Sequence, residues 1–507
     1  MTETNTSIID ETEEKKGALG LSLTAGKWFV INIIIQKIFL IGTFFILARL
    51  LFPKDFGILA IALIVPNFLD LLSSISFDST LIREKDSIHK YLDAIWTFGL
   101  IRSVVIGVAV FLSTPIIVSF FNLSGETTIV MWSGLILLIS NLGNPGQLYF
   151  FKDLDFKKIL WRDLSARIAF TAVSIALALI YHSYWALFLA TAAQYLVGVI
   201  ASYFLHPYRP HLTKHLGILK EIAPYSFWIY GQNIISQLAS TVEDALVGKL
   251  TGAANFGLYG KAKGIAGGPI TPLVSIINKI AFPAFAKIQD SKEKIIDGII
   301  KSTDIMLLVA LPFIAAIAVG GHRIVLLLLG TRWLAITPLL SGLATAFALS
   351  GIATIAVPLF NGIGLPKINF TIGTIYTVTF IATLALLIPP FGTMGAVWGM
   401  IASTFITAVI TMIQIKRTLG MSMRKVWSSF FVVIISVAAV LPIGTALLQK
   451  QFFNSNIGFL SLISLLGVLY LALISLFGRW KMGPGETLLV VFRSIYPALG
   501  KTRQKSA

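Results

Sequence analysis

Long apolar stretches, separated by short polar connections, recur along the chain from Leu21 to Phe477. Each stretch is about 20 residues long, which as a helix crosses a hydrocarbon core of roughly 30 Å. Because no water is available inside a membrane, each span must satisfy its own backbone hydrogen bonds as a helix. The pattern predicts fourteen spans, at 22–48, 58–78, 94–120, 127–148, 163–181, 184–205, 223–247, 256–280, 302–320, 334–356, 369–388, 394–415, 427–448 and 457–477.

One of the turns between spans occurs twice. Residues 49–58 and 249–258 lie 200 positions apart, and both carry a Phe-Gly pair between two long apolar stretches. A turn repeated at the same place in two halves of a membrane chain indicates an internal duplication. The sequence therefore predicts an all-α polytopic membrane protein with two pseudo-symmetric six-helix lobes and two further C-terminal helices.

The predicted organisation has no separate globular domain, because no connection is long enough to form one. Residues 486–499 are amphipathic, and the pattern leaves open whether they form an interfacial helix or a frayed tail. The expected segments are a cytoplasmic N-terminal tail (1–20), a first lobe of spans 1–6 (21–206), a cytoplasmic linker (207–222), a second lobe of spans 7–12 (223–417), spans 13 and 14 (418–480) and a cytoplasmic C-terminal tail (481–507).

Composition and charge support a membrane protein of defined orientation. The chain is 56% hydrophobic and 12% charged, whereas a soluble domain carries about 25% charged residues. A net charge of +17 would suggest nucleic-acid binding in a soluble protein. Here 27 of the 40 Lys and Arg residues lie in the tails and even-numbered turns, and only six lie in the odd-numbered turns. The positive-inside rule therefore places both termini in the cytoplasm and indicates no nucleic-acid partner.

The sequence contains no residue pattern that predicts a metal or cofactor site. The absence of cysteine excludes disulfides and thiolate metal sites. His211 and His215 lie in a basic linker without a carboxylate between them. We therefore expect no metal site and no cofactor.

Polar residues within the spans are the candidate functional groups, because an ionisable side chain at membrane depth is energetically expensive. Lys37 lies about 22 Å along the helix from Ser22, and Arg102 lies about a third of the way into span 3. Cations at this depth suit an anionic head group such as a diphosphate. The candidate head-group ligands are Lys37, Arg102, Lys261, Lys263, Gln36, Asn233 and Gln237.

Acidic residues and turn residues suggest further roles. Asp163 and Arg167, spaced i,i+4, are expected to neutralise each other. The Asn, Gln and Ser stripes also fit a purely structural role as interhelical hydrogen bonds, and spans 10–14 are much plainer. The candidate ligands for a coupling ion, Na⁺ or H⁺, are Asp70, Asp78, Glu243 and Asp244, and the candidate periplasmic gate residues are Arg49 and Lys249.

Six short motifs in a fixed order carry a family resemblance. The chain resembles Wzx-type polysaccharide exporters of the multidrug/oligosaccharidyl-lipid/polysaccharide flippase superfamily, especially the colanic-acid and teichuronic-acid exporter branch. Lipid II flippases usually carry an Arg-Asp pair in span 1, where this chain has Gly42-Thr43-Phe44-Phe45, which argues against a lipid II role. The motifs are Ala48-Arg49-Leu50-Leu51 to Phe56-Gly57, 154–158, Tyr184-Trp185-Ala186-Leu187, 248–259, Phe282-Pro283-Ala284-Phe285 and Gly330-Thr331-Arg332-Trp333.

The resemblance implies a function as well as a fold. It implies a flippase, not an enzyme, in the bacterial inner membrane, and we expect the protein to be a monomer. Its substrate would be an oligosaccharide linked to undecaprenyl diphosphate, moved to the periplasmic leaflet by alternating access for O-antigen or exopolysaccharide synthesis. The prenyl tail would stay in lipid along spans 13 and 14, and a polysaccharide polymerase and glycosyltransferases would be partners.

Two other functional classes are compatible with a polytopic membrane protein. A cation-coupled multidrug exporter of the MATE type shares the architecture, but a cationic drug favours a cavity of carboxylates and aromatics rather than Lys and Arg. A membrane glycan ligase or polymerase usually needs a long outer loop with an acid/base pair, and the outer turns here are short.

Overall fold

The computed structural model describes residues 27–495 apart from 30, 75–76, 78–80, 82–87, 124, 423, 449–454 and 480–483, and all the regular secondary structure in them is helical. The predicted N-terminal tail 1–20 and the candidate Asp78 lie outside the described residues, and of the predicted C-terminal tail 481–507 only Pro484–Ile495 is described. In the described part, ten helices are long and apolar enough to cross a membrane, or up to twelve if each of two bent helix pairs is one span. The prediction of an all-α polytopic membrane protein is confirmed.

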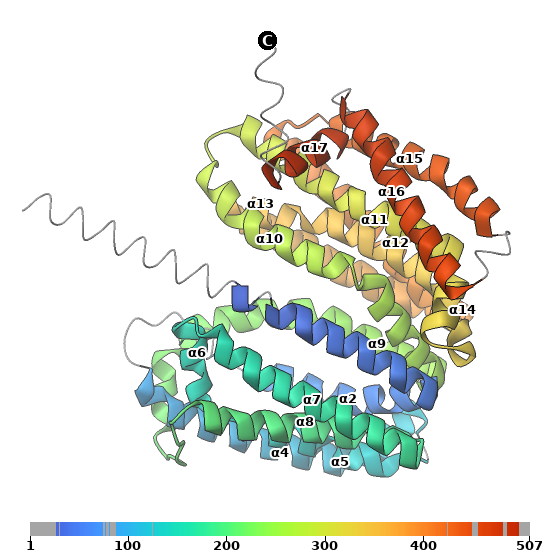
Figure 1. Ribbon diagram of the computed structural model, residues 1–507. Helices are drawn as coiled ribbons and strands as arrows, with labels where there is room; N and C mark the ends of the chain where they lie inside the picture. The colour runs from blue at the N-terminus through green and yellow to red at the C-terminus, as the bar shows by residue number, and fades with distance from the viewer. Residues whose placement is uncertain are drawn as a thin grey trace, which may run out of the picture. The chain divides into compact units, whose positions relative to one another are not determined.

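Contacts divide the chain into two compact units, Met1–Gly257 and Leu258–Ala507. The first unit extends past the predicted first lobe (21–206) and includes the whole of the predicted span 7 (223–247). In it α7 lies alongside α8, and α4 alongside α5 (Figure 1). Its helices are the first span (Lys27–Leu50), α2 (Pro53–Ser73), α4 (His89–Phe121), α5 (Thr127–Asn141), α6 (Leu148–Lys152), α7 (Phe156–Tyr181), α8 (Tyr184–Leu205) and the first part of α9 (Ala223–Gly267), with 3-10 turns η1 (Pro145–Gln147) and η2 (Leu216–Glu221).

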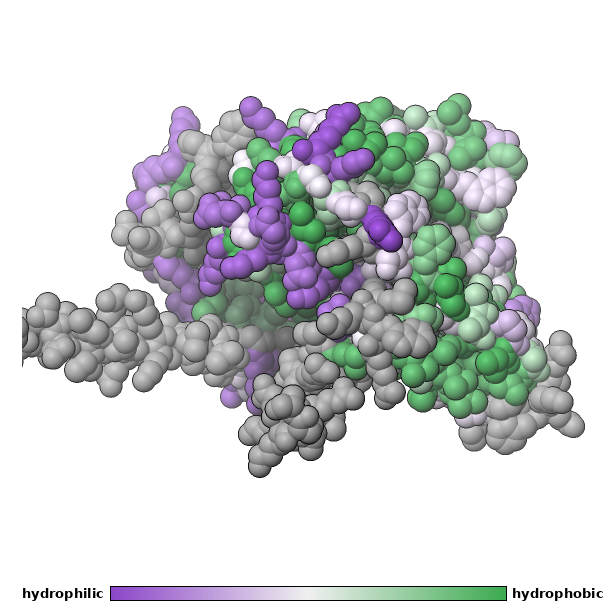
Figure 2. All heavy atoms as spheres, turned by 90° about the horizontal axis from the view of Figure 1, so that it is seen from above, coloured by the Kyte–Doolittle hydropathy of each residue, from purple (hydrophilic) through white to green (hydrophobic). Residues whose placement is uncertain are grey.

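The second unit contains the remaining helices. In it α15 lies beside α16, and α17 packs against α16 and α11 (Figure 1). Hydrophilic side chains gather toward the end where α17 lies, and apolar ones toward the other end (Figure 2). Its helices are α10 (Ile270–Lys287), α11 (Lys292–Leu328), η3 (Thr331–Ile336), α12 (Thr337–Thr354), α13 (Ala356–Gly362), α14 (Pro366–Leu419), α15 (Arg424–Leu448), α16 (Asn456–Arg479) and α17 (Pro484–Ile495).

Both copies of the duplicated turn interrupt the helix at equivalent positions, which are Phe52 in the first copy and Gly252 in the second. Pro53 begins α2, where its missing N–H costs nothing, and the Phe52 amide donates to the Asp55 carboxylate at 2.9 Å. Two hundred residues later α9 breaks at Gly252, which has a φ of 80° that favours glycine. The predicted turns are therefore confirmed, although one begins a helix and the other is a break within a helix.

The two Phe-Gly pairs pack against each other. A Cβ added to Gly57 would lie 1.7 Å from the carbonyl oxygen of Ala253, and one added to Gly257 would lie 2.0 Å from that of Pro53. The contact is reciprocal, because Pro53 and Ala253 are themselves 200 residues apart. Phe56 and Phe256 beside the glycines are 8% and 5% exposed. The close approach of backbone to backbone explains why glycine is required in both copies.

The predicted linker 207–222 is fastened to the first unit by hydrogen bonds. The Tyr208 hydroxyl donates to the Asp93 carboxylate at 2.7 Å, and the His211 amide donates to the same oxygen at 2.8 Å. The Asn144 side-chain amide donates to the carbonyls of His206 and Tyr208. The linker is therefore an ordered strap across the ends of α4 and η1.

The C-terminal helix α17 is held by a buried contact. The Thr487 hydroxyl donates to the Asp304 carboxylate of α11 at 2.7 Å, and Asp304 is 2% exposed. The backbones of Gly478 and Gly485 also approach closely, since a Cβ on Gly485 would lie 2.3 Å from the Gly478 nitrogen. The frayed-tail alternative for 486–499 is thus wrong over α17, which is a helix packed on α16 and α11.

Several predicted boundaries shift for local reasons. Span 5 was expected from residue 163, but α7 begins at Phe156 because the Asp155 side chain caps its first turn, accepting from the Lys158 amide at 3.3 Å. Span 4 ends at Asn141, and the chain bends by 61° into the η1–α6 segment. Span 8 bends by 50° near the expected Gly267-Gly268-Pro269 break.

The glycine contact predicts a sharp stability difference. Gly57→Ala should lower the free energy of unfolding by about 1–3 kcal/mol, because the new methyl group overlaps a backbone carbonyl that cannot rotate away. Gly260→Ala is the matched control, since a Cβ there meets nothing within 4 Å. Thermal unfolding in detergent measures both, and equal midpoints for the two variants would contradict the contact.

The strap predicts a pH dependence. Burial lowers the pKa of His206 below its ordinary value of 6.5, and the positive charges of Lys158 and Arg209 lower it further. Its ring nitrogen Nδ1 also accepts from the Tyr208 amide, which requires the neutral ring. The unfolded chain therefore binds the proton more readily, and stability should fall as the pH drops below about 6.5.

Unfolding midpoints between pH 7.5 and 5.0 test this expectation. His206→Gln should flatten the acid side of the stability profile. The control is His211→Gln, because His211 lies in the same strap with an exposed side chain, and this variant should leave the profile unchanged. If the unfolding midpoint falls equally with pH in the wild type and in His206→Gln, His206 is not the cause of the acid destabilisation.

Candidate functional site

A polar seam joins the first span to α7. The Asn32 amide donates to the Asp163 carboxylate at 2.9 Å, and Arg167 donates from Nε to the Gln36 side-chain oxygen at 3.0 Å. Further along, the hydroxyls of Thr43 and Thr171 are 2.7 Å apart. Asn32, Gln36 and Thr43 share one helix face, so these three contacts fix the rotation of the first span.

Asp163 has a different partner from the one expected. Its Oδ1 accepts from Arg162 at 2.7 and 2.9 Å, and the guanidinium also donates to the side-chain oxygen of Gln147. Arg167 is instead bound to Gln36 on the first span. The direct ion pair of Asp163 is therefore with Arg162 rather than with Arg167, and the charge of Asp163 acts on Arg167 only through a longer-range electrostatic attraction.

Arg102 and Asp70 form an ion pair between α4 and α2. The guanidinium Nη1 lies 2.7 Å from the Asp70 carboxylate and donates to the Asp70 carbonyl at 2.9 Å. It also lies 3.4 Å from the Ser73 hydroxyl. The structure thus joins a candidate head-group ligand to a candidate coupling residue, and each compensates the charge of the other.

Lys37 has the opposite character. It follows Gln36 by one residue, so it points about 100° away from the face bound to α7, and it is exposed. It has no ion-pair or hydrogen-bond partner within the part of the chain that the structure describes. Its exposed neighbours on the first span are apolar, such as Ile33, Ile34 and Ile41. The seam therefore positions a single cation on an otherwise apolar face.

The other candidates are distributed over α9 and the end of the first span. Lys249 lies 4.9 Å from the centre of the Phe120 ring, a cation–π contact. Glu243 is 2% exposed, Gln237 is exposed and Asp244 is half-buried. Arg49 is exposed, and the Asn233 side chain lies outside the described set. Lys261 and Lys263 are half-buried on the part of α9 that belongs to the second unit.

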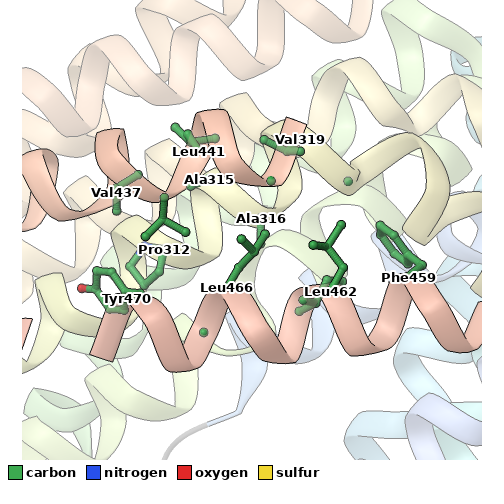
Figure 3. A pocket seen from close by; sticks show the side chains of 15 residues that line it. Pro312, Ala315, Ala316, Val319, Val437, Leu441, Phe459, Leu462, Leu466 and Tyr470 are labelled. Atoms are coloured by element: carbon green, nitrogen blue, oxygen red, sulfur yellow. The ribbon is translucent and has the colours of Figure 1, made fainter. Parts of the chain in front are cut away.

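An apolar groove of about 240 Å³ lies between α11, α15 and α16. Figure 3 shows Pro312 and Val319 on one side and Leu462, Leu466 and Phe459 along α16. The Tyr470 hydroxyl is already engaged, because it donates to the Leu308 carbonyl at 3.2 Å. The groove therefore offers contact surface for a hydrocarbon chain and little for a polar group.

Sequence reasoning missed two polar cavities. One, of about 240 Å³ in the first unit, is lined by the Arg162–Asp163 pair between α5, α7 and α8. The other, of about 230 Å³ in the second unit, lies between α12, α13 and α14 and is rich in hydroxyl groups. The expectation that spans 10–14 are plain is wrong for spans 10–12. Threonines such as Thr404 and Thr407 carry little weight in hydropathy, so their alignment on one face was the available signal.

Together these features identify the general class of membrane protein to which the chain belongs. An all-α polytopic protein with polar seams, a cation on an exposed apolar helix face and an apolar groove has the construction of a membrane transporter. The chain belongs to the polysaccharide biosynthesis protein family, whose model matches residues 46–338. The multidrug/oligosaccharidyl-lipid/polysaccharide superfamily assignment made from the sequence is confirmed.

Individual relatives agree with this assignment. The chain is 24% identical over 437 residues to the lipopolysaccharide biosynthesis protein WzxC of Escherichia coli (strain K12), covering 84% of this chain and 88% of that protein. It is 21% identical over 324 residues to the teichuronic acid biosynthesis protein TuaB of Bacillus subtilis (strain 168), covering 64% and 67%. Its fold is similar to that of the lipid II flippase MurJ in an inward closed conformation, with a TM-score of 0.67, 14% identity and coverage of 89% and 98%.

The ion pair leads to a double-mutant prediction. Arg102→Gln leaves the Asp70 carboxylate without its guanidinium and should lower the free energy of unfolding by roughly 1–3 kcal/mol. The neutral double variant Asp70→Asn/Arg102→Gln should be less destabilised than the two single changes added together. Strictly additive effects in thermal unfolding would show that the two side chains are not coupled.

Proposed function

We propose that this protein is a flippase that moves a lipid-linked oligosaccharide from the cytoplasmic to the periplasmic leaflet. The observation that carries the proposal is the family match over 46–338 in a multi-pass membrane chain. The relatives named above belong to lipopolysaccharide and teichuronic acid biosynthesis, and that shared setting supports a glycan substrate here.

In this proposal Lys37 binds the anionic head group of the carrier lipid. A lysine whose exposed face met only hydrocarbon would be unfavourable at this depth, so we infer that it faces a hydrated cavity. The seam to α7 holds its helix in that orientation. The charges of Arg102 are compensated by Asp70, so Arg102 would reach a diphosphate only by sharing its remaining N–H groups.

The carrier itself is proposed to be undecaprenyl diphosphate. A polyprenyl tail is a long apolar chain, and the groove between α11, α15 and α16 has matching chemistry. Spans 13 and 14, α15 and α16 in the structure, would then guide the tail while the sugar crosses elsewhere.

The proposed topology is fourteen passes with both termini in the cytoplasm of a bacterial inner membrane. The twelve spans become fourteen if α9 and α14 each count as two at their glycine breaks, Gly252 and Gly392. The excess of Lys and Arg in the tails and even-numbered turns supports this orientation.

Coupling to Na⁺ or H⁺ is proposed at Glu243 and Asp244. Asp70 is less suited, because Arg102 already neutralises it. Glu243 is 2% exposed on a membrane-spanning helix and Asp244 follows it directly, and ionisable side chains at membrane depth mark ion and proton pathways. The protein is proposed to act as a monomer that receives substrate made by glycosyltransferases and passes it to a polysaccharide polymerase.

The experiment is complementation of a deletion strain, with surface polysaccharide measured at matched expression. Lys37→Ala should reduce export at least tenfold, because the head group loses its cation. Lys27→Ala removes an exposed lysine at the start of the same span and should leave export intact. Full export by Lys37→Ala would reject the proposed head-group role, and a deletion strain with normal surface glycan but drug hypersensitivity would reject the flippase.

A further inference from the structure

The two polar cavities occupy equivalent places in the duplicated chain. Ser140, Gly143, Gln147, Arg162, Asp163 and Ala166 line the first, and the residues 210 positions later, Ser350, Ala353, Val357, Ile372, Gly373 and Tyr376, line the second. Both cavities therefore derive from the same three spans of each half. Their chemistry has diverged, since Gln147, Arg162 and Asp163 correspond to Val357, Ile372 and Gly373.

The second cavity offers hydrogen-bond acceptors without charge. No Lys, Arg, Asp or Glu is among the described residues that line it. The Thr404 and Thr407 hydroxyls donate to the Met400 and Ser403 carbonyls at 2.7 and 2.8 Å, so their lone pairs remain available. Asn369 uses its amide nitrogen to donate to Val357 and Asn361, which leaves its side-chain oxygen as an acceptor.

Thr411 is the most informative residue of this cavity. It is 2% exposed, and its hydroxyl has no hydrogen-bond partner in the described part of the protein. A buried hydroxyl left without a partner is unfavourable by about 1–3 kcal/mol in protein mutational data. Thr404, Thr407 and Thr411 follow each other at spacings of three and four, so one face of α14 carries three hydroxyls. Such a face calls for a ligand that donates several hydrogen bonds.

We propose that this cavity binds a neutral sugar ring of the lipid-linked glycan. A sugar ring presents several hydroxyl donors around an apolar face, which matches the acceptors of α14 and the ring of Tyr376. A diphosphate would find no cation there, and an acyl chain would leave the Thr411 hydroxyl unpaired. The volume of about 230 Å³ is below the roughly 300–1,000 Å³ of drug-sized sites, which suits one ring rather than a whole repeat unit.

This inference rests on the proposed flippase function, so the test uses two probes. The first is undecaprenyl diphosphate, and the second is the same lipid carrying a neutral oligosaccharide. Binding of each to the purified full chain in nanodiscs is measured for wild type, Thr407→Val and Thr411→Val. The matched control is Thr379→Val, which removes an α14 hydroxyl that donates to the Ile375 carbonyl at 2.7 Å but does not line the cavity.

The expected result is selective. Thr407→Val and Thr411→Val should each weaken binding of the glycolipid by about three- to tenfold, and binding of the sugar-free lipid should not change. Thr379→Val should behave as wild type with both probes. Thr411→Val should also unfold at the same or a higher temperature, because it removes an unpartnered buried hydroxyl, so misfolding does not explain a loss of binding.

Other outcomes overturn the inference in distinguishable ways. Unchanged glycolipid binding in both variants rejects the cavity as a sugar site. Equal loss of both probes assigns the threonines to the general packing of α14. A loss that occurs in NaCl but not in KCl identifies a sodium site instead. If wild type binds neither probe, the proposed function itself fails, and the sugar site fails with it.

Discussion

In a hydrocarbon environment, a polar group that finds no partner within the protein has none at all. This constraint explains the helical backbone and the behaviour of the side chains on it. Hydroxyls such as Thr404 and Thr407 bond to the carbonyls of their own helix. Longer polar side chains reach across to a neighbouring helix, as Asn32 does to Asp163 and Arg102 to Asp70. Lys37 and Thr411 are two of the described groups that stay outside this scheme, and each lies where a ligand could supply the missing partner.

The same constraint separates what the sequence predicts from what it does not. Apolar length and Gly, Pro and Asn breaks locate the spans, because they reflect the membrane and the backbone alone. Pairing between helices depends on which faces meet, and that is why Asp163 was assigned to Arg167 although it binds Arg162. The candidate cations were identified by their depth within the predicted membrane spans. Depth alone does not show that Asp70 compensates the charge of Arg102 or that Lys37 is exposed. The threonines of α14 were overlooked because the hydropathy of threonine is near neutral.

Duplication gives the two halves a common plan with separate chemistry. The cavity built on α5, α7 and α8 retains an arginine and a carboxylate, and its counterpart on α12, α13 and α14 has only neutral groups. A substrate that combines an anionic head, neutral sugars and an apolar tail requires several different surfaces. A repeated scaffold supplies equivalent positions that can diverge independently while the helix packing is preserved.

The contact between Gly57 and Gly257 has a consequence for evolution. Each glycine faces a main-chain carbonyl of the other repeat, and no substitution can remove a main-chain atom. A larger residue in one copy therefore has no compensating side-chain change in the other, so both positions require glycine. Elsewhere the repeats are free to drift, because side chains can adapt to each other. This asymmetry distinguishes the turn from the paired cavities, where equivalent positions of the two halves carry different side chains.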